Sequence, residues 1–179
     1  MTSPEETGEI ELIQIAQQGD ADAFGRLVVR YQQAVFNIAY RMTGNRQEAE
    51  DVAQEAFIKS YQALDRFDPT RPFAPWLYRI TTNTALNWIK RRRPEADMDE
   101  ETTRSETTPD IEAQTIAVEM SDRLRAAIAK LAPNYRAVIE LCHFQGLSYK
   151  EMSEALNVPL SDVKSWLFRA RRRLREVLA

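Results

Sequence analysis

The sequence predicts an all-α fold of two small helical domains joined by a flexible acidic linker. Apolar residues recur at intervals of three and four along most of the chain, and no alternating strand pattern persists. Residues 95–113 interrupt this pattern because they are acidic, rich in Thr and almost without large apolar side chains, so they cannot bury enough surface to become ordered. We therefore predict one domain at residues 1–94 and a second at residues 114–179.

Composition narrows the kind of protein. The 179 residues carry a net charge of −3, with a pI near 5.4, but the cations gather locally, in residues 90–93 and in the last helix. One cysteine and one histidine leave no disulfide framework and too few ligands for a metal site, so adjacent Cys142 and His143 are interpreted as core packing, and no cofactor is expected. No signal peptide or apolar run of membrane-spanning length occurs. We expect a cytoplasmic protein without direct membrane insertion.

Three helices are expected in the first domain before residue 65. The first covers residues 10–18. The second follows a helical apolar period over residues 24–42 and ends at Gly44, and the third runs from about Asn45 to residue 64. Small side chains line the inner face of the third helix, which consists of Ala49, Val52, Ala53, Ala56, Ser60 and Ala63.

A second face of that third helix carries polar residues. Asp51, Gln54, Glu55 and Ile58 line up at helical spacing, and spacing alone favours a solvated acidic face. Paired carboxylates also occur in acid–base catalysis, but that use needs burial or a charged partner that shifts a pKa. The sequence supplies no such partner.

A turn-rich loop at residues 65–72 leads into a long helix at about residues 73–93. Its off-stripe surface combines aromatic, amide and basic side chains, which suits single-stranded nucleic acid. Taken alone, the helix is better explained by core aromatics and by a helix C-terminus that favours cations. The stripe expected to be buried consists of Phe73, Leu77, Ile80, Thr84 and Trp88.

The second domain is expected to hold a helix-turn-helix. Helices are predicted from near residue 115 and again after Pro133. Ser148 and Glu151 then form a capping box, and Pro159 follows a break that begins a new helix. Two short helices around a tight break are the form that enters a major groove.

The last helix separates into an apolar face and a basic face. Phe168 stands off the apolar stripe among cations, where it suits neither core nor solvent but could contact thymine methyl groups. This placement favours DNA binding over a solvated basic face. The apolar face consists of Val163, Leu167, Ala170, Leu174 and Val177.

Three blocks of the chain resemble the bacterial extracytoplasmic-function (group 4) sigma factors of the sigma-70 family. EAEDVAQEAFIKSY at 48–61 resembles the helix that binds the polymerase clamp, and FAPWLYRITTNTALNWIKRRR at 73–93 resembles the helix that melts promoters. LAPNYRAVIEL, with GLSYKEMSEALNVPLSDVKSWLFRARRRLRE, resembles sigma domain 4. The resemblance implies a domain 2 helical bundle, a linker and a domain 4 helix-turn-helix, in an alternative sigma factor that performs no covalent chemistry.

Carried over by position, the resemblance implies three contact surfaces. The polymerase-binding residues would be Asp51, Gln54, Glu55, Phe57 and Ile58. The melted minus-ten element would meet Phe67, Arg71, Trp76, Tyr78, Arg79, Asn83, Asn87, Lys90, Arg91, Arg92 and Arg93. The minus-thirty-five duplex would meet Tyr149, Ser161, Lys164, Ser165, Phe168, Arg169, Arg171 and Arg172.

The implied partners are core RNA polymerase, through its β′ clamp and β flap, promoter DNA and a cognate anti-sigma factor. The chain departs from the family where the recognition helix begins. Ser161 and Asp162 stand where Gly-Thr is common, and Trp166 replaces a usual arginine. An aspartate there repels phosphate but can accept a hydrogen bond from cytosine, which predicts an unusual minus-thirty-five preference.

Other functions remain open from the residues themselves. A helix-turn-helix regulator with an N-terminal sensing or dimerisation domain accounts for the second domain, but gives the helix at 73–93 no task. A polymerase accessory protein or anti-terminator would bind the enzyme without reading promoters. An enzyme would need a nucleophile–base pair, a phosphate loop or a metal signature, and none is present.

Overall fold

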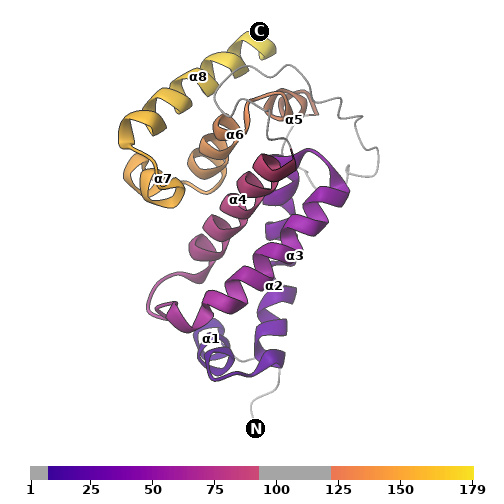
Figure 1. Ribbon diagram of the computed structural model, residues 1–179, viewed down its shortest axis with the longest axis vertical. Helices are drawn as coiled ribbons and strands as arrows, with labels where there is room; N and C mark the ends of the chain where they lie inside the picture. The colour runs from indigo at the N-terminus through magenta and orange to yellow at the C-terminus, as the bar shows by residue number, and fades with distance from the viewer. Residues whose placement is uncertain (1–7, 93–121) are drawn as a thin grey trace.

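The computed structural model describes residues 8–92 and 122–179, and its helices occur in the predicted order (Figure 1). The predicted linker at 95–113 lies outside the described residues. The N-terminal helices are α1 (Glu9–Gln17), α2 (Ala21–Thr43), α3 (Arg46–Ala63), the short 3₁₀ turn η1 (Leu64–Arg66) and α4 (Phe73–Arg92). The C-terminal ones are α5 (Asp122–Ala129), α6 (Pro133–Ile139), the π-helical turn η3 (Glu140–Phe144), α7 (Tyr149–Leu156) and α8 (Leu160–Leu178).

Local capping sets the ends of the N-terminal helices. Asp20 accepts a hydrogen bond from the Ala23 amide at 3.0 Å, which satisfies a donor at the start of α2. Gly44 ends α2 with φ 70°, a left-handed conformation that glycine adopts readily. Asn45 then caps α3 through the Glu48 amide at 3.0 Å. The predicted boundaries of these helices are confirmed to within a few residues.

The first domain is a bundle in which α2, α3 and α4 pack against one another and α1 lies at the end nearest the N-terminus (Figure 1). At that end an aromatic cluster fills the core. Phe67 is only 6% exposed, and its ring centroid lies 5.5 Å from that of Phe73 and 4.7 Å from that of Trp76. The rings hold the loop after η1 against the start of α4.

The second domain is built on the predicted helix-turn-helix. Both halves of the capping box are present, since Ser148 accepts from the Glu151 amide and Glu151 accepts from the Ser148 amide. Asn157 adopts φ 53°, which ends α7, and α8 begins directly after Pro159. The buried face of α8 is confirmed for Val163, Leu167 and Ala170, whereas Leu174 is partly buried and Val177 is 41% exposed because the last turn extends past the core.

The Cys142–His143 pair does not form a common core contact. Cys142 packs partly against the core of the second domain, but His143 is exposed. The two residues are consecutive on the turn η3, so their side chains leave the backbone in different directions, and the His143 ring accepts a hydrogen bond from Arg171 of α8. The described residues contain no cluster of three or more potential metal ligands.

The two domains pack against each other instead of standing apart. Ala137 of α6 belongs to the same buried cluster as Ala39 of α2, Val52 of α3 and Ala85 of α4. This contact buries Leu86 and Thr82 of α4, which the sequence pattern had placed off the buried stripe. Expected core residues Ile80 and Trp88 are in turn only half-buried. In the described ranges, no helix combines the length and apolar character needed to cross a bilayer.

Candidate polymerase and nucleic-acid interfaces

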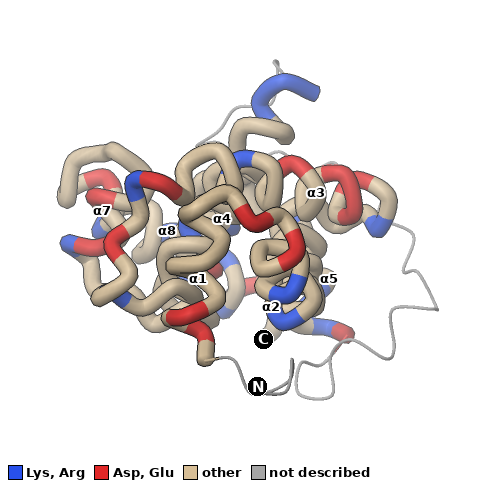
Figure 2. Tube along the Cα trace, turned by 90° about the horizontal axis from the view of Figure 1, so that it is seen from below, with Lys and Arg blue, Asp and Glu red and all other residues tan. Residues whose placement is uncertain are grey.

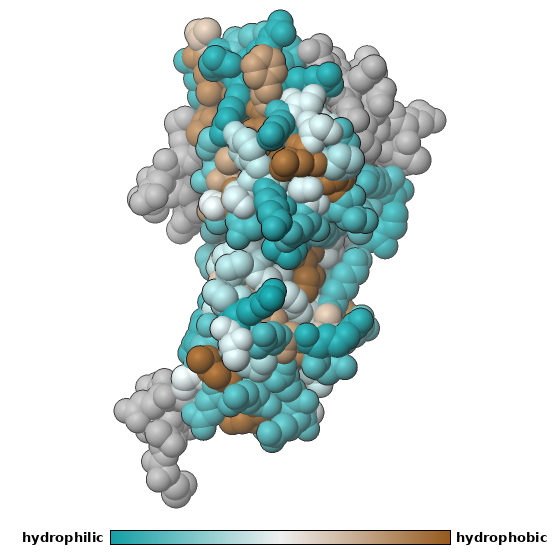
Figure 3. Space-filling view, turned by 90° about the vertical axis from the view of Figure 1, so that its left-hand side faces the viewer, coloured by the Kyte–Doolittle hydropathy of each residue, from teal (hydrophilic) through white to brown (hydrophobic). Residues whose placement is uncertain are grey.

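The exposed face of α8 carries the side chains predicted to read duplex DNA. Phe168 is 62% exposed, and Lys164, Arg169 and Ser161 are exposed beside it, directly opposite the buried face of the helix. Ser165 is half-buried, and Tyr149 at the start of α7 is 40% exposed. Figure 3 views the side on which α7 and α8 lie in the upper part, where hydrophilic atoms surround separate apolar patches.

The arginines further along α8 are held by neighbours in the same domain. Arg171 donates from Nε to Nε2 of His143 at 3.3 Å, and Arg172 donates to Glu176 at 3.1 Å. Partial desolvation, together with the Arg171 guanidinium, lowers the pKa of His143. The neutral imidazole that results can accept the Arg171 hydrogen bond, so it orients this cation.

The end of α4 presents the predicted phosphate-binding cations. Lys90, Arg91 and Arg92 are exposed, and Arg93 lies outside the described residues. The Arg92 guanidinium lies 4.9 Å from the centroid of the Trp88 ring, and Arg91 bonds to both carboxylate oxygens of Glu55 at 3.1 Å. The cations are therefore positioned by an aromatic ring on α4 and a carboxylate on α3.

The amide and aromatic residues of α4 have different surroundings. Asn87 is exposed, while Trp76, Tyr78, Arg79 and Asn83 are half-buried. Asn83 donates from Nδ2 to the Ala155 carbonyl of α7 at 2.7 Å. The second domain thus covers part of the surface that the sequence predicts for the melted strand.

The loop before α4 is organised by an aspartate that the sequence reading did not single out. Asp68 accepts from the Thr70 amide at 2.9 Å and from the Thr70 hydroxyl at 2.7 Å, and these bonds lower its pKa. Arg71 is exposed, with Nε 3.9 Å from Asp68. Phe67 faces the core rather than solvent, so in this conformation its ring anchors the loop.

A groove of about 800 Å³ lies between α2 and α3. Gln54, Phe57 and Ile58 from the predicted polymerase-binding set line it, and Ile58 is 52% exposed. The other wall comes from α2, which sequence reasoning missed because helical periodicity assigned its apolar residues to the core. The apolar lining residues are Ala21, Phe24, Val28, Phe36, Ala53, Phe57, Ile58 and Tyr61.

Asp51 and Glu55 do not line this groove. Asp51 is half-buried, whereas Glu55 lies between Lys59 at 2.9 Å and Arg91 at 3.1 Å. Burial alone would raise the pKa of Glu55, but the hydrogen bonds from Lys59 and Arg91 outweigh burial and lower it. The carboxylate therefore stays ionised and joins α3 to α4. Acidic residues continue along α3 (Figure 2).

Comparison with known proteins identifies the chain. The model of the sigma-70 region 2 family matches residues 27–95, and the model of sigma-70 region 4 matches residues 121–174. The chain is 39% identical over 176 residues to the ECF RNA polymerase sigma factor SigW of Bacillus subtilis, covering 93% of this chain and 94% of SigW. It is 36% identical over 170 residues to the ECF RNA polymerase sigma-E factor of Escherichia coli K12, covering 89% and 88%.

A solved structure has a similar fold. The structure of CnrH in complex with the cytosolic domain of CnrY aligns with a TM-score of 0.60 at 28% identity, over 95% of this chain and 96% of that chain. The region 2 match gives the N-terminal bundle a task that a simple helix-turn-helix regulator would not need. The chain therefore belongs to the extracytoplasmic-function sigma factors of the sigma-70 family, non-enzymatic proteins that direct promoter-specific transcription initiation by RNA polymerase.

Proposed function

We propose that this sigma factor docks on the β′ clamp of core polymerase, reads the minus-thirty-five element as duplex and captures the minus-ten element as melted non-template strand. The observation that carries the proposal is the open apolar groove between α2 and α3. A protein that acted on DNA alone would leave this surface exposed without use. The same bundle supplies α4, so docking would place the strand-binding helix beside the enzyme.

The groove suits a helical partner. It is long enough to be lined by residues from Phe24 to Phe36 on one side and from Glu50 to Gln62 on the other, and it is largely apolar. An amphipathic or coiled-coil surface inserts apolar side chains into such a groove at helical spacing. We assign it to the β′ clamp, with Gln54, Phe57 and Ile58 as direct contacts and Asp51 at its margin. Glu55 acts by holding Arg91.

Two DNA surfaces follow. On α8, Lys164, Ser165, Phe168 and Arg169 would face base edges, with Arg171 and Arg172 on phosphates. Ser161 and Tyr149 would contact the groove margin. On α4, Lys90, Arg91, Arg92 and Arg93 would hold phosphates, while Trp76, Tyr78, Arg79, Asn83 and Asn87 would contact unpaired bases. Phe67 and Arg71 would shape the pocket for an extruded base.

Extruding a base costs a few kcal/mol, which contacts made only with the single strand offset. Each DNA surface alone binds weakly. Polymerase would fix their separation, and two weak contacts then act at a high effective concentration. The β flap would hold the second domain in this arrangement. The sigma factor would act in the cytoplasm, where core polymerase and promoter DNA are found.

A cognate anti-sigma factor is a further proposed partner. CnrH, whose structure aligns with nearly the whole of this chain, was solved in complex with the cytosolic domain of CnrY. This chain has a similar fold and an apolar groove that a partner segment could also occupy. We propose that an anti-sigma protein competes with polymerase for this groove.

Transcription by purified core polymerase, with and without this protein, tests the proposal. Promoters are recovered from a random DNA library by the mixture and then compared one at a time. We expect initiation at specific positions only when the protein is present. If core polymerase gains no specific initiation while the protein alone protects duplex DNA, the chain acts as a simple DNA-binding regulator and the proposal is wrong.

A further inference from the structure

We propose that this sigma factor inhibits itself: its second domain closes on the strand-binding helix α4 and is held there by a polar latch, which must open before promoter DNA is bound. The inference rests on the proposed function and adds its regulation. The latch consists of Arg41 on α2, Glu140 and Gln145 at η3, and Arg136 on α6.

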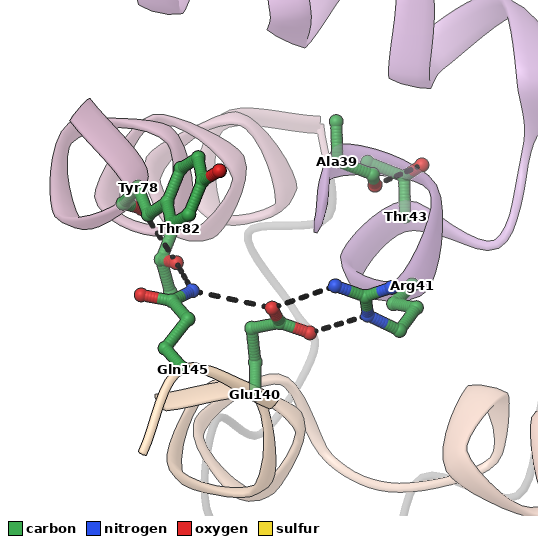
Figure 4. A network of polar contacts seen from close by, with 7 residues as sticks. All are labelled: Ala39, Arg41, Thr43, Tyr78, Thr82, Glu140 and Gln145. Carbon is green, nitrogen blue, oxygen red and sulfur yellow. Dashed lines mark hydrogen bonds and ion pairs between the residues drawn. The ribbon is translucent and has the colours of Figure 1, made fainter. Parts of the chain in front are cut away.

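Arg41 and Glu140 form the centre of the latch (Figure 4). The Arg41 guanidinium donates to both Glu140 oxygens, at 2.6 Å and 2.9 Å, and the Glu140 side chain is only 2% exposed. Two parallel charge-assisted bonds fix orientation as well as distance. Arg41 also lies 4.2 Å from the centroid of the Phe144 ring. One cation of the first domain is thus held from two sides by η3 of the second.

Gln145 extends the latch to α4. Its Nε2 donates to the Thr82 hydroxyl at 3.0 Å and to Glu140 at 3.2 Å, so the dashed contacts in Figure 4 run without a break from α4 through η3 to α2. Thr82 in turn donates to the Tyr78 carbonyl of its own helix. The second domain therefore forms hydrogen bonds with α2 and α4 at the same time.

A second contact anchors α6 at the end of α2. Arg136 is 5% exposed and donates from Nη1 to the Met42 carbonyl at 2.5 Å and from Nε to the Leu131 carbonyl at 2.8 Å. Met42 lies in the last turn of α2, where carbonyls lack partners within the helix and the helix dipole favours a cation. Arg136 satisfies this carbonyl from the other domain.

Closure covers part of the DNA-binding surface. Asn83 is proposed to contact an unpaired base, but in the closed form its side-chain amide donates a hydrogen bond to the Ala155 carbonyl. The field of Arg79 also reaches Glu151 at the start of α7, where the Ser148 amide is the main cause that lowers the Glu151 pKa. Two base-contacting candidates of α4 therefore face α7 in the closed form, and a DNA strand would have to displace α7.

In the closed form the two DNA-binding surfaces also lie too close together to contact both promoter elements. Ala155 touches Asn83, and the backbone from Ala155 to Phe168 spans at most about 30 Å, so the two DNA readers lie within about 40 Å of each other. Elements centred near minus ten and minus thirty-five are separated by roughly 25 base pairs, or about 85 Å of duplex. Simultaneous binding requires the domains to separate.

The latch is built to release. Gln145 Oε1 and Arg79 Nε are buried and have no hydrogen-bond partner among residues 8–92 and 122–179, which weakens the closed form relative to a solvated open form. The groove between α2 and α3 has separate lining residues, and none of the four latch residues lines it. Polymerase can therefore dock on the closed protein first and then capture the second domain once it opens.

Arg41→Gln tests the latch in the full-length protein. This change leaves Glu140 buried without its bidentate cation, so the open population rises. We expect a larger radius of gyration by small-angle X-ray scattering, and a fall of about tenfold in the sigma concentration that half-saturates transcription with core polymerase, since apparent affinity scales with the competent fraction. Adding Glu140→Gln removes the stranded carboxylate and should restore part of the closure.

Arg30→Gln is the matched control. It removes the same charge from the same helix, but Arg30 pairs with Glu9 of α1 at 3.8 Å, away from the second domain. It should match the wild type in both measurements. Gln145→Ala removes the bonds to Thr82 and to the Glu140 carboxylate but leaves the Arg41–Glu140 ion pair in place, so it should act in the same direction as Arg41→Gln to a smaller extent. This variant covers the case in which Arg41→Gln misfolds.

The outcomes separate the latch from the proposed function. If the wild type initiates specifically but Arg41→Gln and Gln145→Ala keep its radius and half-saturation, the latch is wrong and the function stands. A larger radius without a lower half-saturating concentration means closure does not inhibit, which also overturns the inference. If the wild type never initiates specifically, the proposed function fails, while scattering still reports whether the latch exists.

Discussion

Asn83 on α4 and Ala155 at the end of α7 are joined by a 2.7 Å hydrogen bond, although 72 residues separate them in the chain. The bond occupies a side-chain amide that the family resemblance assigns to base contact. The same side chain is thus proposed to have two alternative partners, the protein's own backbone and an unpaired base. The predictions below concern each of the surfaces involved.

Asn83→Ala is expected to reduce open-complex formation more than polymerase affinity. The amide would contact the melted strand, whereas the groove between α2 and α3 does not include this residue. Permanganate reactivity of the minus-ten region measures melting, and fluorescence anisotropy with labelled protein measures core binding. Equal losses in both would place Asn83 in the fold instead of the DNA surface.

Ile58→Ser should weaken binding to core polymerase by about tenfold, because burying an isoleucine side chain contributes about 1.5–3 kcal/mol. Ile58 is 52% exposed in the free protein, so its replacement should leave thermal stability nearly unchanged. Ile10→Ser is the control, since Ile10 is 59% exposed on α1 outside the groove. Equal effects of the two changes on affinity would remove the groove from the docking site.

Phe168→Ala should lower initiation at promoters that depend on the minus-thirty-five element by about fivefold, the effect of losing roughly 1 kcal/mol of apolar contact with base edges. The ring is 62% exposed, so folding does not depend on it. Val177→Ala changes an apolar residue that is 41% exposed on the last turn of the same helix. Run-off transcription with and without the upstream element measures both variants, and the two should differ only on the intact promoter.

Ser148→Ala removes one half of the capping box of α7. The expected loss is about 1 kcal/mol in the free energy of unfolding, or a fall in Tm of about 2–4 °C if the protein unfolds as one unit. Calorimetry checks this value. Ser161→Ala, at an exposed position on α8, serves as the control. A Tm unchanged by Ser148→Ala would mean that the cap adds nothing to stability.

His143 predicts a pH effect with a definite sign. Its pKa is lower in the folded protein than its ordinary value of 6.5, so the unfolded chain binds the proton more tightly. Stability should therefore fall as the pH drops below about 6.5 and become level below the folded pKa. The effect is small because the side chain is largely exposed. Urea unfolding of His143→Gln should show a flatter profile between about pH 5 and 7 than the wild type.

The helices could be predicted from the sequence because the interactions that begin and end them involve residues close together in the chain. Asn45, Gly44 and the Ser148–Glu151 box act through hydrogen bonds or backbone angles within a few residues, and the structure has them where the pattern predicts them. Family assignment depends on whole blocks and was likewise predictable. The position of Phe168 off the buried face of α8 was also predictable, because its ring breaks the helical apolar pattern, and the ring is 62% exposed.

Contacts between domains were not predictable in the same way. Periodicity placed Thr82 and Leu86 off the buried face, since a helical pattern records one buried stripe and α4 is covered from a second side by the other domain. Phe67 looked like a loop residue without context because its partners, Phe73 and Trp76, lie on the next helix. The α2 wall of the groove was missed because residues that line an open groove and residues that line a core recur with the same apolar spacing along a helix.

Arg136 and Met42, which meet across the domain boundary, belong to a single molecule. A separate inhibitor protein is exhausted when its target is overproduced, so excess target escapes in proportion to gene dosage. The latch is part of every molecule of this protein. The fraction of molecules in the closed form is therefore the same at any expression level. Raising the amount of this protein in a cell would therefore leave the closed fraction unchanged, and any threshold in its output would come from the proposed anti-sigma protein instead of the latch.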